Sequence, residues 1–152
     1  MHLRVVDPVS GAATTALGEY YAELDRRFPG GFVPEPRDNG ADALRAPGGA
    51  FVVATSDGAP VACGGVRRLD DSTGEIKRMW VAPDWRGAGL GARLLRRLED
   101  EARRLGYARA VLGTNGVLTE ALAMYGRVGY RTTGPYRLDN PYEQVFFEKP
   151  LG

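Results

Sequence analysis

The sequence predicts an α/β fold in which strands and helices follow one another in the order βα(α)βββαβαββ. Three features support this order. Apolar residues at helical spacing alternate with short β-branched and aromatic runs. Turn signals in the middle of the chain join three such runs into an antiparallel meander. A cluster of glycines then separates the meander from a strongly amphipathic helix. The 152 residues are expected to form a single domain, 1–152.

The N-terminal part of the chain predicts a strand and a helix. Residues 3–7 have the pattern of a short strand that Pro8 stops. Residues 12–28 place five apolar side chains at helical spacing, namely Leu17, Tyr20, Tyr21, Leu24 and Phe28. The stretch PGGFVPEPRDNG that follows is rich in turn residues, and a short helix fits near residues 39–46.

The meander covers the middle of the chain. Residues 51–55 and 60–69 predict two strands joined by a hairpin turn at Asp57-Gly58. A second turn over residues 70–74 leads into a third strand over residues 75–82.

The amphipathic helix extends to about Leu105, and Gly106 stands where a C-cap belongs. Its apolar stripe consists of Leu90, Leu94, Leu98, Ala102 and Leu105, with Leu95 beside it. The other face is expected to be solvated and to carry the i,i+4 pairs Arg97–Glu101, Glu99–Arg103 and Asp100–Arg104.

The C-terminal part predicts one more helix between strands. A strand is expected over residues 108–114, and a helix over 118–128 that Gly129 closes. Two further strands are expected over 130–134 and 143–149. The chain shows no repeat, no low-complexity segment and no linker between domains.

The composition excludes several classes of protein. The net charge of +1 offers no electropositive surface for nucleic acid. No apolar run reaches the ~18 residues of a membrane span, and MHLRVVDPVSG lacks the apolar core of a signal peptide, so a cytoplasmic protein is expected. Cys63, the only cysteine, lies in an apolar run and is interpreted as a small core side chain. With His2 as the only histidine, no metal site of the usual His/Cys kind is expected.

The stretch VAPDWRGAGLGARLL, residues 81–95, suggests a ligand. Each of its glycines weakens a helix by roughly 1 kcal/mol relative to alanine. Glycines between a strand and a helix let backbone N–H groups approach a phosphate, whose binding would offset this cost. The P-loop pattern GxxxxGK[ST] is absent. Gly87, Gly89 and Ala92 meet the dinucleotide pattern GxGxxG/A, but PDWR separates them from the strand, and the next strand does not end in an acidic residue.

A third pattern fits this stretch better. RGAGLG, residues 86–91, matches the (Q/R)xxGx(G/A) signature of the GNAT superfamily of acetyl-CoA-dependent N-acetyltransferases. EIKRMWVAPDWRGAGLGARLL resembles the family's fourth strand, pyrophosphate loop and third helix, and EALAMYGRVGY resembles its later segment with a tyrosine before a Gly-aromatic pair. The element order agrees across nearly the whole chain. The resemblance implies a GNAT fold: a mixed, mainly antiparallel central sheet, helices on both faces, and splayed fourth and fifth strands.

The resemblance also implies acetyl-CoA as the cosubstrate, with no metal. Pantetheine would lie in the gap between the splayed strands, against the backbone of Met79 and Val81. The pyrophosphate would bind the N–H groups of a loop made of Arg86, Gly87, Ala88, Gly89, Leu90, Gly91 and Ala92. The family often has an asparagine where this chain has Leu118. Asn115 is close enough in sequence to replace it, or to serve as a turn residue.

Two residues match catalytic positions of the family. Tyr125 matches the tyrosine that protonates the leaving thiolate, although it also fits a core stripe with Leu118 and Leu122. Glu75 stands where part of the family has a general base. An amine with a pKa of about 10 must lose a proton before it attacks, so Glu75 would need a raised pKa or a bridging water. The alternative for Glu75 is a solvent-facing carboxylate at a strand end.

Substrate recognition in the family usually falls to the first two helices and the C-terminal hairpin. The candidates in this chain are Tyr20, Tyr21, Phe32, Arg78, Tyr136 and Tyr142. Three acidic residues are further candidates for binding a cationic amine, namely Glu23, Asp38 and Asp139.

The predicted reaction is direct acetyl transfer from acetyl-CoA to a primary amine, because Cys63 offers no credible nucleophile for a ping-pong route. The expected acceptor is a small molecule: an amino acid, a polyamine or an amine-bearing antibiotic. The alternatives are a protein N-terminus or lysine as acceptor, a non-catalytic sensor of acetyl-CoA, and a nucleotide-binding regulator. The resemblance is compatible with a homodimer.

Overall fold

The computed structural model describes residues 1–34 and 40–152, and its centre is one seven-stranded sheet in the order β1-β2-β3-β4-β5-β7-β6. The strands are β1 (His2–Val5), β2 (Ala50–Ser56), β3 (Ala59–Asp70), β4 (Thr73–Val81), β5 (Arg109–Thr114), β6 (Arg131–Thr133) and β7 (Val145–Pro150). All neighbours are antiparallel except β4 and β5, which are parallel. The predicted order of elements and the mixed, mainly antiparallel sheet are confirmed.

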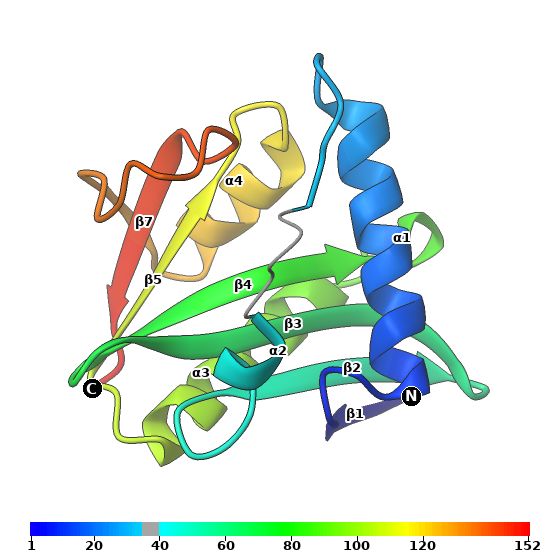
Figure 1. Ribbon diagram of the computed structural model, residues 1–152, viewed down its shortest axis with the longest axis horizontal. Coiled ribbons are helices and arrows are strands. Elements are labelled where there is room, and N and C mark those ends of the chain that lie inside the picture. Colours follow the sequence, from blue (N-terminus) through cyan, green and yellow to red (C-terminus); the bar gives the residue numbers. More distant parts are fainter. Residues whose placement is uncertain (35–39) are drawn as a thin grey trace.

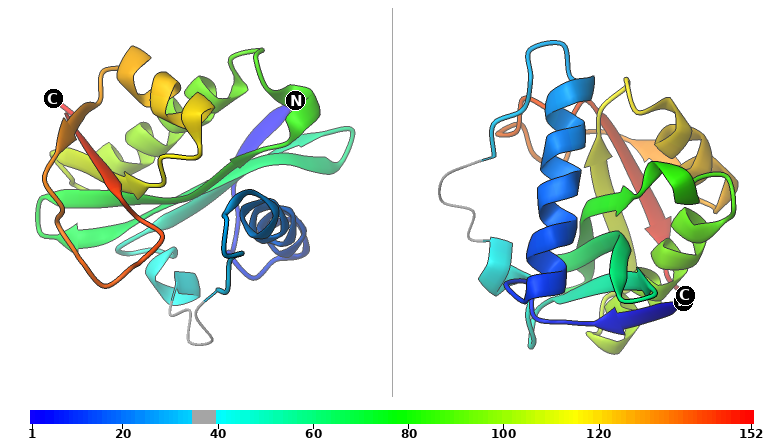
Figure 2. Two further views of the ribbon diagram at one scale, coloured as in Figure 1. Left: turned by 90° about the horizontal axis from the view of Figure 1, so that it is seen from above. Right: turned by 90° about the vertical axis from the view of Figure 1, so that its right-hand side faces the viewer.

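Helices cover both faces of the sheet. They are α1 (Gly11–Arg27), α2 (Gly40–Ala43), α3 (Leu90–Arg104) and α4 (Thr119–Arg127), with a 3₁₀ turn, η1 (Pro83–Trp85), that the sequence pattern did not predict. Figure 2 shows α1 and α2 on one face and α3 and α4 on the other. The predicted stripe of α3 is buried against the sheet, with Leu94 and Leu98 fully enclosed. None of the described helices has the length and apolar character of a membrane span.

The strands β4 and β5 splay apart, as expected. They pair only over Thr73–Glu75 and Arg109–Val111, and beyond this point they diverge (Figure 1). A bulge bends β4 soon after the divergence begins, since Arg78 and Met79 together face the single residue Gly64 of β3. Arg78 has a left-handed φ of 59°, a conformation uncommon for a residue with a side chain. The bulge therefore sets the backbone direction of β4 along the gap.

Turn and cap glycines form as their sequence positions predicted. Asp57 and Gly58 both have positive φ values, 51° and 79°, as a two-residue type I′ hairpin requires. Gly129 follows α4 with a φ of 101°, and the Tyr130 N–H donates to the Tyr125 carbonyl in a Schellman closure. The rings of Tyr125 and Tyr130 meet edge to face at 6.0 Å, so the closure of α4 also fixes Tyr125.

The charged face of α3 differs in part from its prediction. The Arg97–Glu101 pair is confirmed, but the pairs Glu99–Arg103 and Asp100–Arg104 were wrong. Glu99 lies between the apolar positions Leu95 and Ala102 on the helix surface, so it is buried, 2% exposed. It accepts hydrogen bonds from Tyr130 (2.9 Å) and Lys149 (3.0 Å).

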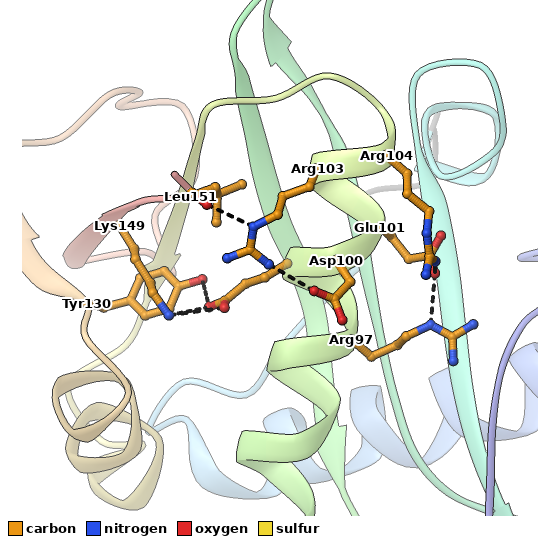
Figure 3. A network of polar contacts seen from close by, with 9 residues as sticks. Arg97, Asp100, Glu101, Arg103, Arg104, Tyr130, Lys149 and Leu151 are labelled. Carbon is orange, nitrogen blue, oxygen red and sulfur yellow. Dashed lines mark hydrogen bonds and ion pairs between the residues drawn. The ribbon is translucent and has the colours of Figure 1, made fainter.

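The basic residues at the end of α3 pair differently as a result. In Figure 3, Arg103 reaches Asp100 and the Leu151 carbonyl, and Arg104 reaches Glu101. The contact of Arg103 with the Leu151 carbonyl joins the last turn of α3 to the end of the chain after β7.

Candidate active site

Two clefts open beside the gap between β4 and β5. The first, of about 560 Å³, is named the aromatic cleft. It lies among α1, the segment after it, both splayed strands and the loop between β6 and β7. The second, of about 520 Å³, is named the glycine-loop cleft. It lies among α1, the end of β4, residues 86–92 and α4. Both have the size of small-molecule sites.

The two clefts meet. Their shared lining consists of Tyr20, Leu24, Met79, Leu118, Ala121 and Tyr125. A molecule in one cleft can therefore contact a molecule in the other along this wall.

The glycine loop presents free backbone N–H groups. Gly87 and Gly89 have φ values of 81° and 84°, and Gly89 is the N-cap of α3. The first hydrogen bond of the helix runs from the Arg93 N–H to the Gly89 carbonyl, so the N–H groups at residues 90–92 have no partner within the helix. A Cβ at Gly87 or Gly89 would meet no described atom within 4 Å, which shows that glycine serves the backbone conformation there and not packing. Such a helix start binds anions.

Tyr125 stands at the junction of the clefts. Its side chain is 6% exposed and packs against Tyr130 and Phe147. Its hydroxyl lies 3.9 Å from the Met79 sulfur, in the bulged part of β4. Burial raises the pKa of Tyr125, so the phenol keeps its proton at neutral pH. The two interpretations of Tyr125 from the sequence, a core side chain and a proton donor, are thus compatible. The ring packs in the core, and the hydroxyl lies at the junction of the clefts.

Glu75 is fully buried and its carboxylate is held on both sides. Arg67 donates to one oxygen at 2.8 Å and Tyr136 to the other at 2.7 Å. Arg137 and Lys77 approach to 3.4 and 3.8 Å. Burial alone would raise the pKa of Glu75, but the charges of Lys77 and Arg67 and the hydrogen bonds of Tyr136 and Arg67 outweigh burial and lower it. The solvent-facing carboxylate and the raised pKa considered from the sequence are both wrong, and the residue does not line either cleft.

Comparison with known proteins identifies the family. Residues 17–130, three quarters of the chain, match the model of the Acetyltransferase (GNAT) family. The chain belongs to this family. It is an acetyl-CoA-dependent N-acetyltransferase, with acetyl-CoA as its cosubstrate.

Individual relatives agree. The chain is 36% identical over 140 residues to the IAA acetyltransferase of Azospirillum brasilense. The match covers 90% of this chain and 91% of that protein. It is 34% identical over 132 residues to the N-alpha-acetyltransferase RimI of Mycobacterium tuberculosis, covering 84% and 82%. A GNAT-family acetyltransferase of Staphylococcus aureus has the same fold, with a TM-score of 0.80 at 18% identity, over 99% of this chain and 100% of that one. A GNAT acetyltransferase of Elizabethkingia anophelis, solved with acetyl-CoA bound, has a TM-score of 0.69 at 18% identity, covering 98% and 97%.

Most residues that the GNAT resemblance assigned to the cofactor gather at the glycine-loop cleft. Those that line it are Met79, Val81, Arg86, Gly87, Gly89, Gly91 and Ala92. Ala88 and Leu90 are not in its lining, and the Leu90 side chain is buried in the core. Arg86 folds back: its Nε donates to the Val81 carbonyl at 3.0 Å and its guanidinium pairs with Glu23. The side chain thereby ties the glycine loop to β4 and α1.

Asn115 is a turn residue, and its assignment to the cofactor is corrected. Its side-chain oxygen accepts from the Val117 N–H and its amide donates to the Tyr142 carbonyl, both at 3.0 Å. Both ends of the side chain are therefore engaged with backbone. The residue lines the aromatic cleft and not the glycine-loop cleft, where Leu118 gives an apolar wall.

The predicted substrate residues divide between several places. Tyr20, Tyr21, Phe32, Arg78 and Tyr142 line the aromatic cleft, and so does Asp139. Tyr136 lies outside the lining and serves Glu75 instead. Glu23 lines the glycine-loop cleft. Asp38 lies outside the described residues.

Several residues of the aromatic cleft were not predicted from the sequence. Phe28 extends its aromatic wall and stacks on Tyr142 with ring centroids 5.5 Å apart. Lys77 on β4 and Glu143 in the loop before β7 form an ion pair at 3.1 Å. The alternation of β4 could have placed Lys77 beside the splay, whereas Glu143 precedes a strand by two residues and carries no sequence signal.

Cys63 is remote from the chemistry. It is fully buried between β3 and α1, it lines neither cleft, and burial raises the pKa of its thiol. Its interpretation as a core side chain is confirmed. Among the described residues, no three His, Cys, Asp or Glu side chains are grouped as a metal site.

Proposed function

We propose that the protein transfers an acetyl group directly from acetyl-CoA to the primary amine of a small molecule while both are bound. The observation that carries this proposal is the wall shared by the two clefts, with Tyr125 and Met79 in it. Acetyl-CoA in the glycine-loop cleft and an amine in the aromatic cleft would meet there. Cys63 lines neither cleft, so its thiol is not placed to form a covalent acetyl-enzyme.

The glycine-loop cleft supplies the parts that the cofactor needs. The free N–H groups at the start of α3 would hold the pyrophosphate. Pantetheine would run along the bulged end of β4, past Met79 and Val81. Because the Val81 carbonyl already accepts a hydrogen bond from Arg86, Val81 would contact pantetheine through its N–H group.

Tyr125 would act on the leaving group. A CoA thiol, with a pKa of about 8.5, leaves as a thiolate that needs a hydrogen-bond donor. The protonated Tyr125 hydroxyl, at the junction of the clefts, is placed to be that donor.

We assign Glu75 a positioning role in place of that of a base. Its carboxylate gathers Arg67, Lys77 and Tyr136 beneath the aromatic cleft, whose lining includes Arg67 and Lys77. The neutral amine that attacks the thioester would then come from the free-base fraction in solution or from a water chain.

The cleft walls favour a small acceptor. Five aromatic rings from α1, the segment after it and the loop before β7 pack in a continuous series, with centroids 4.7 to 5.9 Å apart. They enclose a space suited to a compact amine with an apolar body. The similarity to RimI favours a protein N-terminus as the second candidate acceptor.

Both β1 and β7 pair into the one sheet, which supports residues 1–152 as a single catalytic domain.

An acceptor panel tests the proposal. Thiol release from acetyl-CoA is measured with amino acids, polyamines, aminoglycosides and aromatic amines, and with peptides bearing a free N-terminus or a lysine. Turnover with a small amine is expected. Turnover with peptides alone would indicate that the acceptor is a protein. Binding of acetyl-CoA without turnover of any acceptor would indicate a non-catalytic sensor of acetyl-CoA.

A further inference from the structure

The aromatic cleft contains a carboxylate that the proposed chemistry has not used. Glu143 lies in the loop between β6 and β7, and this loop is fastened to the end of β5. The Gln144 N–H donates to the Thr114 carbonyl at 2.8 Å, and the Asn115 amide donates to the Tyr142 carbonyl at 3.0 Å. The backbone on either side of Glu143 is thus held by the end of β5, where this strand no longer pairs with β4.

The carboxylate occupies space that a glycine provides. A Cβ on Gly113 would lie 2.7 Å from the carboxyl carbon of Glu143 and about as close to both oxygens, so a larger residue at position 113 would displace the carboxylate from this position. The Glu143 side chain is 9% exposed. The Glu143 carboxylate is therefore part of the cleft wall and is not extended into solvent.

The two oxygens of Glu143 differ. Oε2 pairs with Lys77 at 3.1 Å. Oε1 is buried and accepts no hydrogen bond from any described group. A buried acceptor without a partner is costly, and more so for a charged group. Because this oxygen is enclosed, a cationic donor in the cleft would satisfy it once the Glu143 side chain turns its carboxylate toward the cleft that it lines.

We propose that Glu143 Oε1 binds the ammonium group of the acceptor and so selects amines that are cationic. This inference rests on the proposed function, because it concerns the acceptor of that reaction. The aromatic wall of Tyr21, Phe32 and Tyr142 would hold the apolar body of the same molecule, and aromatic faces also attract cations.

Binding explains the position of Glu143 better than proton removal does. A glutamate in water is about six pKa units less basic than a primary amine, so a carboxylate holds an ammonium ion far more readily than it deprotonates it. The Glu75 carboxylate cannot take this role, since both of its oxygens are engaged and it does not line the cleft. Glu143 therefore acts as a specificity residue that touches the acceptor.

Two matched probes test the proposal without turnover. The 2-phenylethylammonium ion and the neutral 2-phenylethanol are titrated by calorimetry into the CoA-bound protein. The wild type is compared with Glu143→Gln, which keeps the size of the side chain and removes its charge. The variant is expected to bind the ammonium ion about 10- to 100-fold more weakly, the range for a hydrogen bond to a charged group, and to bind the alcohol unchanged.

A control variant and the outcomes make the test decisive. Glu148→Gln removes a carboxylate from β7 that pairs with Arg109 and Arg131 outside both clefts, so it should bind both probes like the wild type. Equal affinity of wild type and Glu143→Gln for the ammonium ion would overturn the proposal, as would an equal loss for both probes. Failure of the acceptor panel alongside the expected binding difference would reject the proposed reaction and keep the ammonium site.

Discussion

The hydroxyl of Tyr125 on α4 lies 3.9 Å from the sulfur of Met79 on β4. Met79 belongs to the bulge that bends β4 within the gap, and Tyr125 precedes the glycine closure of α4. The contact therefore joins the bulge of β4 to the C-terminal part of α4 at the place where the two clefts meet. A donor at this position can reach a thioester only if the acetyl end of the cofactor lies between the splayed strands.

Tyr125→Phe tests the donor role. The change keeps the ring that packs on Tyr130 and Phe147 and deletes only the hydroxyl. We expect kcat to fall by about 10²- to 10⁴-fold under single-turnover conditions, with acetyl-CoA affinity unchanged. Tyr107→Phe is the matched control, because Tyr107 is also buried but donates to the Gly48 carbonyl and lines neither cleft. An unaltered rate in the Tyr125 variant would leave its ring as core and assign the donor elsewhere.

Substitution of the two glycines at opposite ends of α3 distinguishes an effect on acetyl-CoA binding from an effect on stability. Gly89 and Gly106 have φ values of 84° and 94°, and a Cβ on either would meet no described atom within 4 Å. Alanine at either position should cost about 1 kcal/mol of stability through left-handed backbone strain. Only Gly89→Ala should weaken acetyl-CoA binding, by at least about 10-fold, because only Gly89 shapes the anion-binding loop.

The thermal shift measures this difference. Acetyl-CoA at about a hundredfold excess over Kd should stabilise the wild type and Gly106→Ala by roughly 2.7 kcal/mol, while NAD should not stabilise either. A full acetyl-CoA shift in Gly89→Ala would show that the loop does not hold the pyrophosphate.

Glu75→Gln should affect stability more than catalysis. Removing the carboxylate leaves Arg67, Lys77 and Arg137 around an uncharged amide, and loss of one partner from such a buried cluster costs about 3 kcal/mol. The pH profile of kcat should keep its shape, since the residue does not line a cleft. A profile that loses its dependence on a base would restore Glu75 to the mechanism.

Acid unfolding should reveal the same residue. The pKa of Glu75 is lower in the folded protein than its ordinary value of 4.5. Its contribution to stability is therefore complete above that value and is lost as the pH falls through the lower, folded-state pKa. The difference in unfolding free energy between wild type and Glu75→Gln, measured with urea, should narrow below pH 4.5. A constant difference at all pH values would contradict an ionised Glu75.

Local signals predicted much of this fold. The order of elements followed from periodicity and turn residues, and Gly58, Gly106 and Gly129 stand at the left-handed positions that their contexts indicated. The splay followed from the family resemblance, and the bulge at Arg78 and Met79 accompanies it. These features depend on neighbours in sequence or on a motif, so they can be found before the fold is known.

The details of the site depend on contacts between distant segments. Glu99 looked like part of a solvated face but receives Lys149 from β7. Glu75 looked like an exposed strand end but is covered by Tyr136 from the loop after β6. Glu143 gains its place only because Gly113, thirty positions earlier, leaves room for it. No periodicity in the sequence encodes such pairings.

Radiolabelled acetyl-CoA distinguishes direct transfer across the Tyr125 junction from transfer through an acetyl-enzyme. The protein is mixed with acetyl-labelled acetyl-CoA in the absence of an amine, and label on the protein and free CoA are measured on the timescale of one turnover. Direct transfer predicts no labelled protein and no burst of CoA, and transfer of the label to product only when the amine is added. A stoichiometric burst of CoA with the label bound covalently to the protein would contradict it.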